Sequence, residues 1–102
     1  MSGMMLDRAL AALLRALAAG PAGRFHIVSA ASTPWASATF EGARHAVTLA
    51  LEGEDAAGRA AHLRRTLPEM EFSLRGNLVA DIAAIPDDGA NLGFEALILA
   101  EY

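Results

Sequence analysis

The sequence predicts an α+β two-layer sandwich, in which two helices lie on one face of an antiparallel sheet. Three observations predict it: a leucine-rich segment with helical spacing, several runs with two-residue alternation, and a second helical segment between those runs. The expected element order is α-β-β-β-α-β-β. Because the connections are short and the chain has 102 residues, we expect one domain over residues 1–102.

The first helix is expected at residues 4–19. Ser2 is a candidate N-cap, and Gly20-Pro21 is a typical stop signal after the last turn. Charged side chains fall away from the apolar stripe on the helical wheel. We therefore expect the helix to dock through Leu6, Leu10, Leu13, Leu14 and Leu17.

Three strands are expected next, at residues 24–32, 37–41 and 44–52. A bend at Thr33-Pro34 separates the first two, and the EGAR segment at 41–44 provides the turn of a hairpin. Strict alternation predicts which side chains share a face. In the first strand these are Phe25, Ile27, Ser29 and Ala31, and in the third His45, Val47, Leu49 and Leu51.

A second helix is expected at residues 53–67, with acidic residues at its start and arginines at its end. Pro68 ends it. A long strand follows, in which Gly76-Asn77 is a tight turn or a bulge. The turn at 86–89 (PDDG) then leads into a last strand at residues 94–102.

Both faces of these last two strands are apolar. Since two helices can cover only one face, a second copy of the chain is expected to cover the other, giving a homodimer packed sheet against sheet. Small residues on that face would let the two sheets approach closely. The alternation assigns Val79, Ala83, Ile85, Leu97 and Leu99 to this face, with Ala30, Ala46 and Ala50 as the small residues.

Composition excludes several classes of function. The net charge is −4 and the eight arginines are spread along the chain, which argues against nucleic acid as a partner. Lysine and cysteine are absent, which excludes Schiff-base lysines, P-loop lysines and thiol nucleophiles. The three histidines lack metal-ligand spacing, so we expect no metal and no cofactor.

The N-terminal twenty residues are apolar, but Asp7, Arg8 and Arg15 interrupt them. They therefore fit neither a signal peptide nor a membrane span. Abundant alanine and arginine without lysine indicate a GC-rich bacterial genome. The expectation is a cytoplasmic bacterial protein without a membrane partner.

The segment TPWASATFEGARH at residues 33–45 has two interpretations. In the functional one, Trp35 stacks on a ligand while Arg44 and His45 hold an anion. In the structural one, which we favour, the segment is an edge strand and a turn whose aromatic residues pack.

Asp81 is a lone carboxylate in an apolar strand, and it too has two interpretations. Burial would raise its pKa and suit it to an active site, or it pairs with Arg44, with Arg75 or across a dimer. We favour the ion pair. Ser37, His45 and Asp81 could together form a Ser-His-Asp set, although no G-x-S-x-G motif accompanies them.

The sequence therefore predicts a homodimeric, non-catalytic binding or accessory module, whose small-molecule or protein partner the residues do not specify. The alternative is a small enzyme with a site built from Trp35, Arg44, His45 and Asp81. An enzyme requires these side chains to converge in one cleft, whereas a module allows them to be dispersed.

Overall fold

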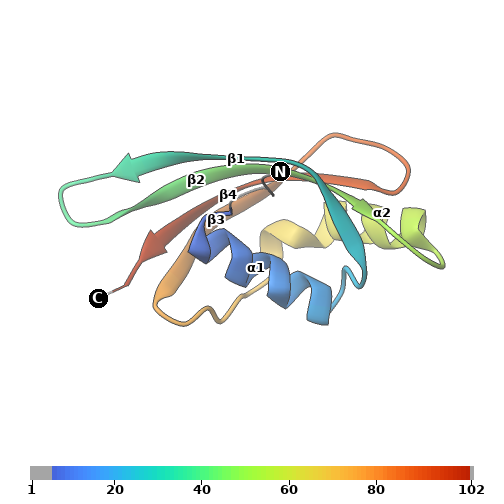
Figure 1. The fold of residues 1–102 in the computed structure, drawn as a ribbon, viewed down its shortest axis with the longest axis horizontal. Coiled ribbons are helices and arrows are strands. Elements are labelled where there is room, and N and C mark those ends of the chain that lie inside the picture. The colour runs from blue at the N-terminus through green and yellow to red at the C-terminus, as the bar shows by residue number, and fades with distance from the viewer. Residues whose placement is uncertain (1–5, 102) are drawn as a thin grey trace, which may run out of the picture.

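The protein folds as a two-layer α+β structure, seen in a computed structural model that describes residues 6–101 (Figure 1). Both helices lie on the same face of one four-stranded antiparallel sheet. The predicted fold class is confirmed. In chain order the elements are α1 (Arg8–Ala19), β1 (Phe25–Ala36), β2 (Glu41–Leu51), α2 (Ala56–Thr66), the 3₁₀ helix η1 (Leu67–Glu69), β3 (Asn77–Ile85) and β4 (Asn91–Ala100).

The sheet consists of two hairpins, β1–β2 and β3–β4, arranged in the order β1-β2-β4-β3. Every neighbouring pair is antiparallel, so β2 and β3 run parallel with β4 between them. A parallel pair requires a crossover connection, and α2 provides it. The strands β1 and β3 are therefore the two edges of the sheet.

A single core lies between the helices and the covered face of the sheet. The predicted leucine stripe of α1 is confirmed, since four of its leucines are buried and Leu6 packs against them. Phe94 of β4 is fully buried beneath the helices. The other buried core residues include Val47, Leu49, Leu51, Ala60, Leu63, Leu67, Ile82, Leu92, Ala96 and Ile98.

The helix boundaries differ from the prediction at the N-terminal end. Residue Asp7 is the N-cap of α1, and its side chain accepts hydrogen bonds from the backbone N–H groups of Ala9 and Leu10. The helix therefore begins at Arg8 instead of residue 4, and Ser2 lies outside the described residues. Its end at Gly20 is as predicted.

Two long strands replace the three expected between the helices, so the prediction of a separate strand at 37–41 is wrong. The strand β1 continues through Pro34, which is tolerated because β1 is an edge strand. The turn lies at residues 37–40 and not at 41–44. Ser37 closes it, because its backbone N–H donates to the carbonyl of Phe40 at 2.8 Å and its Oγ accepts from the Phe40 N–H.

Gly42 lies where β2 approaches β4 most closely. A Cβ atom at this position would collide with the carbonyl oxygen of Ile98. Trp35 is its partner on β1, and an aromatic residue opposite a strand glycine supplies the contact that glycine lacks. The TPWASATFEGARH segment is therefore one hairpin.

The second hairpin also departs from the expected boundaries. Residues 70–76 precede β3 without forming a strand, and Gly76, at φ +75°, belongs to a turn in which the Asn77 N–H donates to the carbonyl of Leu74. This resolves the alternative at Gly76-Asn77 in favour of a turn. The last strand begins at Asn91, three residues earlier than predicted.

A bulge interrupts each edge strand and reverses the predicted faces beyond it. The β1 register shifts between Ile27 and Ser29, and the β3 register shifts between Val79 and Asp81. Residues directly opposite each other in a sheet share a face. The partners of Ala30 and Val79 are the buried Val47 and Ile98, so both residues lie on the covered face and their assignment to the dimer face was wrong.

Truncating the leucine stripe should destabilise the protein strongly. Leu13 is fully buried, so we expect Leu13→Ala to lower the free energy of unfolding by about 2–5 kcal/mol, through lost burial and a residual cavity. Urea denaturation measures this. The control Arg15→Ala, at an exposed position of the same helix, should change it by less than about 0.5 kcal/mol. Equal losses of unfolding free energy in the two variants would show that the leucine stripe does not stabilise the core.

Candidate functional site

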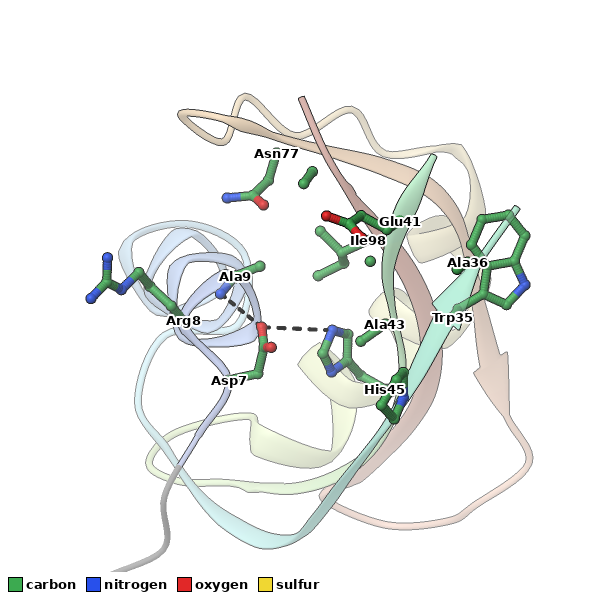
Figure 2. A pocket seen from close by; sticks show the side chains of 13 residues that line it. Asp7, Arg8, Ala9, Trp35, Ala36, Glu41, Ala43, His45, Asn77 and Ile98 are labelled. Atoms are coloured by element: carbon green, nitrogen blue, oxygen red, sulfur yellow. Dashed lines mark hydrogen bonds and ion pairs between the residues drawn. The ribbon is translucent and has the colours of Figure 1, made fainter. Parts of the chain in front are cut away.

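A cleft of about 540 Å³ opens between the N-terminal end of α1 and the ends of β1, β2 and β4 (Figure 2). Its polar lining includes Asp7 and Arg8 from the start of α1, Glu41 and His45 from β2, and Asn77 from β3. Its size falls within the usual range for small-ligand sites, about 300–1,000 Å³. The fold thus collects polar side chains from three elements on the covered side of the sheet.

Asp7 has two neighbours in this cleft, the helix and His45. Its Oδ1 accepts from the N–H groups of Ala9 at 2.8 Å and Leu10 at 3.1 Å. These bonds satisfy two of the amides that a helix leaves unpaired at its start. The side chain remains 39% exposed toward the cleft opening, so its negative charge is available to a ligand.

His45 is the one charged or polar residue among the described residues that is fully buried, with 0% exposure. Its Nδ1 lies 2.7 Å from Oγ of Ser32, the residue opposite it on β1. Its Nε2 lies 3.9 Å from Oδ1 of Asp7, which is too long for a hydrogen bond, and has no other partner among residues 6–101. One ring nitrogen is thus fixed and the other is unsatisfied.

Burial sets the protonation state of this ring. Removal from water lowers the pKa of His45 below 6.5, and the Asp7 carboxylate opposes this only in part. His45 is therefore neutral at neutral pH. A neutral imidazole has one N–H and one lone pair, so one of its nitrogens always accepts.

Ser32 lies at Nδ1 of His45 and Asp7 lies near Nε2, but no hydrogen bond joins Asp7 to the ring. A catalytic histidine needs a hydrogen bond from its second nitrogen to the acid, and the 3.9 Å separation does not provide one. The backbone amides of Ala9 and Leu10 bind Asp7, so these two are not available to stabilise an oxyanion.

The other candidates from the sequence lie elsewhere. Trp35 borders the cleft, but its ring points away from His45 (Figure 2). Arg44 and Asp81 are exposed on the face of the sheet that the helices leave open. Of the four candidates, the structure therefore places only His45 inside the cleft.

Asp81 is not the buried carboxylate that its neighbours suggested. The bulge before it turns it to the open face, where it is exposed. Among the described residues it makes no ion pair with Arg44 or Arg75. The expected pairing is therefore absent within one chain.

The open face of the sheet, which we call the outer face, mixes apolar and charged side chains. A row of directly paired residues crosses it from β1 to β3 as Thr33, Arg44, Leu97 and Asp81. Leu78 and Ile85 are 43% and 37% exposed. Other side chains on this face are those of Ala46, Ala50, Glu95 and Leu99, of which Leu99 is only 7% exposed.

Sequence reasoning identified His45 but missed Asp7 and Ser32 as its neighbours. The Ser37 of the hypothetical Ser-His-Asp set instead closes the β1–β2 turn. An aspartate before a helical leucine stripe is a recognisable cap signal, but it does not show which strand the cap faces. Ser32 comes opposite His45 only because of the bulge in β1.

The described residues contain no group of three or more metal-ligating side chains placed to hold an ion. None of the helices within residues 6–101 is long and apolar enough to cross a membrane. Comparison with known proteins finds no matching family model, curated protein or solved structure. The features of the molecule that bear on its function are the cleft and the outer face.

Acidification should destabilise the protein through His45. Its pKa is lowered in the folded state, so as the pH falls below about 6.5 the unfolded chain takes up a proton that the folded chain resists. The free energy of unfolding should then decrease until the pH passes the folded pKa. Urea denaturation between about pH 7.5 and pH 5 measures this loss.

Two variants isolate the contribution of His45. His45→Gln should show a smaller loss over the same pH range, whereas His62→Gln, at an exposed position of α2, should keep the original dependence. An NMR titration that places the pKa of His45 at or above 6.5 would contradict the expected sign.

Proposed function

We propose that this protein is a homodimeric, non-catalytic binding module whose two copies associate through their outer faces. The observation that carries the proposal is the row of Arg44, Leu97 and Asp81 across a sheet face that neither helix covers. On the sequence grounds given above, the module belongs to the bacterial cytoplasm. The cleft beside His45 lies on the other side of the sheet and stays accessible in such a dimer.

Charge complementarity favours a second copy as the occupant of the outer face. Arg44 lies on β2, and the acidic residues Asp81 and Glu95 lie on β3 and β4. A two-fold axis along the strands, between β2 and β4, would place the β2 half of one copy over the β4 half of the other. Arg44 would then lie over the half of the partner sheet formed by β3 and β4, which carries the acidic residues. Its position along the strand direction would match that of Asp81 of the partner subunit.

The same axis brings apolar surface together. The axis preserves the level along the strands, so Leu97 on β4 would pack against the aliphatic part of Arg44 of the partner subunit, and Ala46 would pack against the aliphatic part of Glu95 of the partner subunit. Small residues such as Ala46 allow the two sheets to pack about 10 Å apart. Each Å² of apolar surface removed from water contributes about 25 cal/mol to association.

The placement of the polar residues supports binding over catalysis. The alternative enzyme required Trp35, Arg44, His45 and Asp81 to converge, but Arg44 and Asp81 lie on the outer face while His45 lies beneath α1. The charges on the outer face suit recognition, because complementary charges fix the register of two surfaces.

The proposed dimer predicts a mass of about twice 10.6 kDa by sedimentation at micromolar concentration. Leu97→Arg should reduce the mass to that of one chain, because it places a second positive charge against Arg44 of the partner subunit in a desolvated interface. Arg15→Glu, on the exposed side of α1, should leave the dimer intact. A single-chain mass for the unmodified protein would refute the proposal.

A charge exchange tests the orientation of the two copies. Arg44→Glu alone and Asp81→Arg alone should each weaken association, since each opposes like charges across the axis. The double variant should recover part of the lost affinity. If it associates no better than the single variants while all remain folded by circular dichroism, the proposed axis is wrong.

A further inference from the structure

We propose that the cleft beside His45 binds a protonated primary amine carried on a short alkyl chain. The proposal names the ligand of the binding role proposed above, but it does not depend on the dimer, because the cleft lies on the covered side of the sheet. Its basis is a set of polar side chains that converge from α1, β2 and β3, one of which is a buried imidazole whose Nε2 has no hydrogen-bond partner among residues 6–101.

The charge of the lining favours a cation. Asp7 and Glu41 bring two carboxylates to the cleft, and the side chain of Glu41 extends into it (Figure 2). The guanidinium of Arg8 extends away from His45 in the same view, so it does not neutralise them there. Glu41 makes an interaction of its own, so the proposal relies on the charge of Asp7, whose side chain is 39% exposed.

An anion is disfavoured although a helix begins here. The start of a helix attracts anions through its free amides, but the amides of Ala9 and Leu10 already bind Oδ1 of Asp7. The protein thus supplies its own anion to this helix. A second anion would have to lie beside two carboxylates.

His45 provides the second, independent observation. Its Nδ1 lies 2.7 Å from Oγ of Ser32, a hydroxyl that can either accept from Nδ1–H or donate to Nδ1, so both neutral tautomers fit this contact. A bound ammonium ion would select the Nδ1–H tautomer, in which Nε2 carries the lone pair. In that tautomer the lone pair lies 3.9 Å from a carboxylate oxygen, and a donor that bonds both atoms removes their repulsion. An ammonium group carries three donors and can bond both.

The ammonium group meets Asp7 before His45. The Asp7 side chain is 39% exposed, whereas Nε2 of His45 has almost no exposed surface. A small displacement of the carboxylate then admits one N–H to Nε2. Asn77 adds an acceptor on the far side, because its Nδ2 donates to the carbonyl of Arg75 at 3.2 Å and leaves its Oδ1 to accept.

Apolar residues between these acceptors define the rest of the ligand. Ala9, Ala43, Ile98 and Ala100 line the cleft with short side chains and no charge. Such a surface accommodates a few methylene groups and offers no partner to additional polar groups. The chemical class is therefore a simple alkylammonium ion.

Titration of the full-length protein with butylammonium chloride tests the proposal. At about pH 7.5, where His45 is neutral, the imidazole resonances of His45 should shift and those of the exposed His26 and His62 should not. Sodium butyrate and butanol, which have similar chains without the positive charge, should produce no shift at His45. Butylammonium should also move the Nε2 resonance toward that of a hydrogen-bonded acceptor.

Asp7→Asn separates binding from folding. Asparagine caps helices about as well as aspartate, so the variant should fold while its dissociation constant for butylammonium rises by about tenfold. The matched control Asp88→Asn, on the exposed β3–β4 turn, should bind as the unmodified protein does. Failure of butylammonium to shift His45, equal binding of butyrate, or unchanged binding by folded Asp7→Asn would each overturn the proposal.

The outcome is distinguishable from that of the dimer experiment. A single-chain mass in sedimentation would refute the dimer and leave the amine titration interpretable. A failed titration by a protein that sediments as a dimer would refute the amine site alone.

Discussion

The packing of both helices on one face of the sheet is the constraint on which the rest of this structure depends. It follows from the connectivity, because α2 must cross β4 to join two parallel strands and α1 shares its core. One face of the sheet is consequently buried beneath the helices, and the other face is exposed to solvent. Neighbouring residues therefore have opposite environments, as Arg44 is exposed while His45 is fully buried.

The helices and the leucine core could be predicted because they depend on local periodicity. A stripe such as that of Leu10 and Leu13 fixes both the element and the side that it buries, and tertiary contacts only confirm it. Strand faces were less predictable. One inserted residue reverses the alternation, and nothing in the local sequence at Val28 or Ala80 marks the bulge.

The candidate site shows the same division between local and tertiary information. His45 stood out from the sequence as a histidine within an apolar alternation, and that alternation continues unbroken along β2. Asp7 and Ser32 did not, because one belongs to a helix cap and the other lies beyond a bulge. Their proximity depends on where α1 docks over the sheet. The sequence indicates which residue caps the helix, but it does not indicate where α1 docks on the sheet.

The two bulges have a consequence for how the sheet ends. Both interrupt the edge strands β1 and β3, while the inner pair β2 and β4 remains in regular register. An unbroken edge is a template on which a further strand can be added, and repeated addition produces fibres. Breaking the ladder near Val28 and Ala80 shortens that template on both sides. The irregularities that obscured the sequence pattern thus protect the folded chain from open-ended growth.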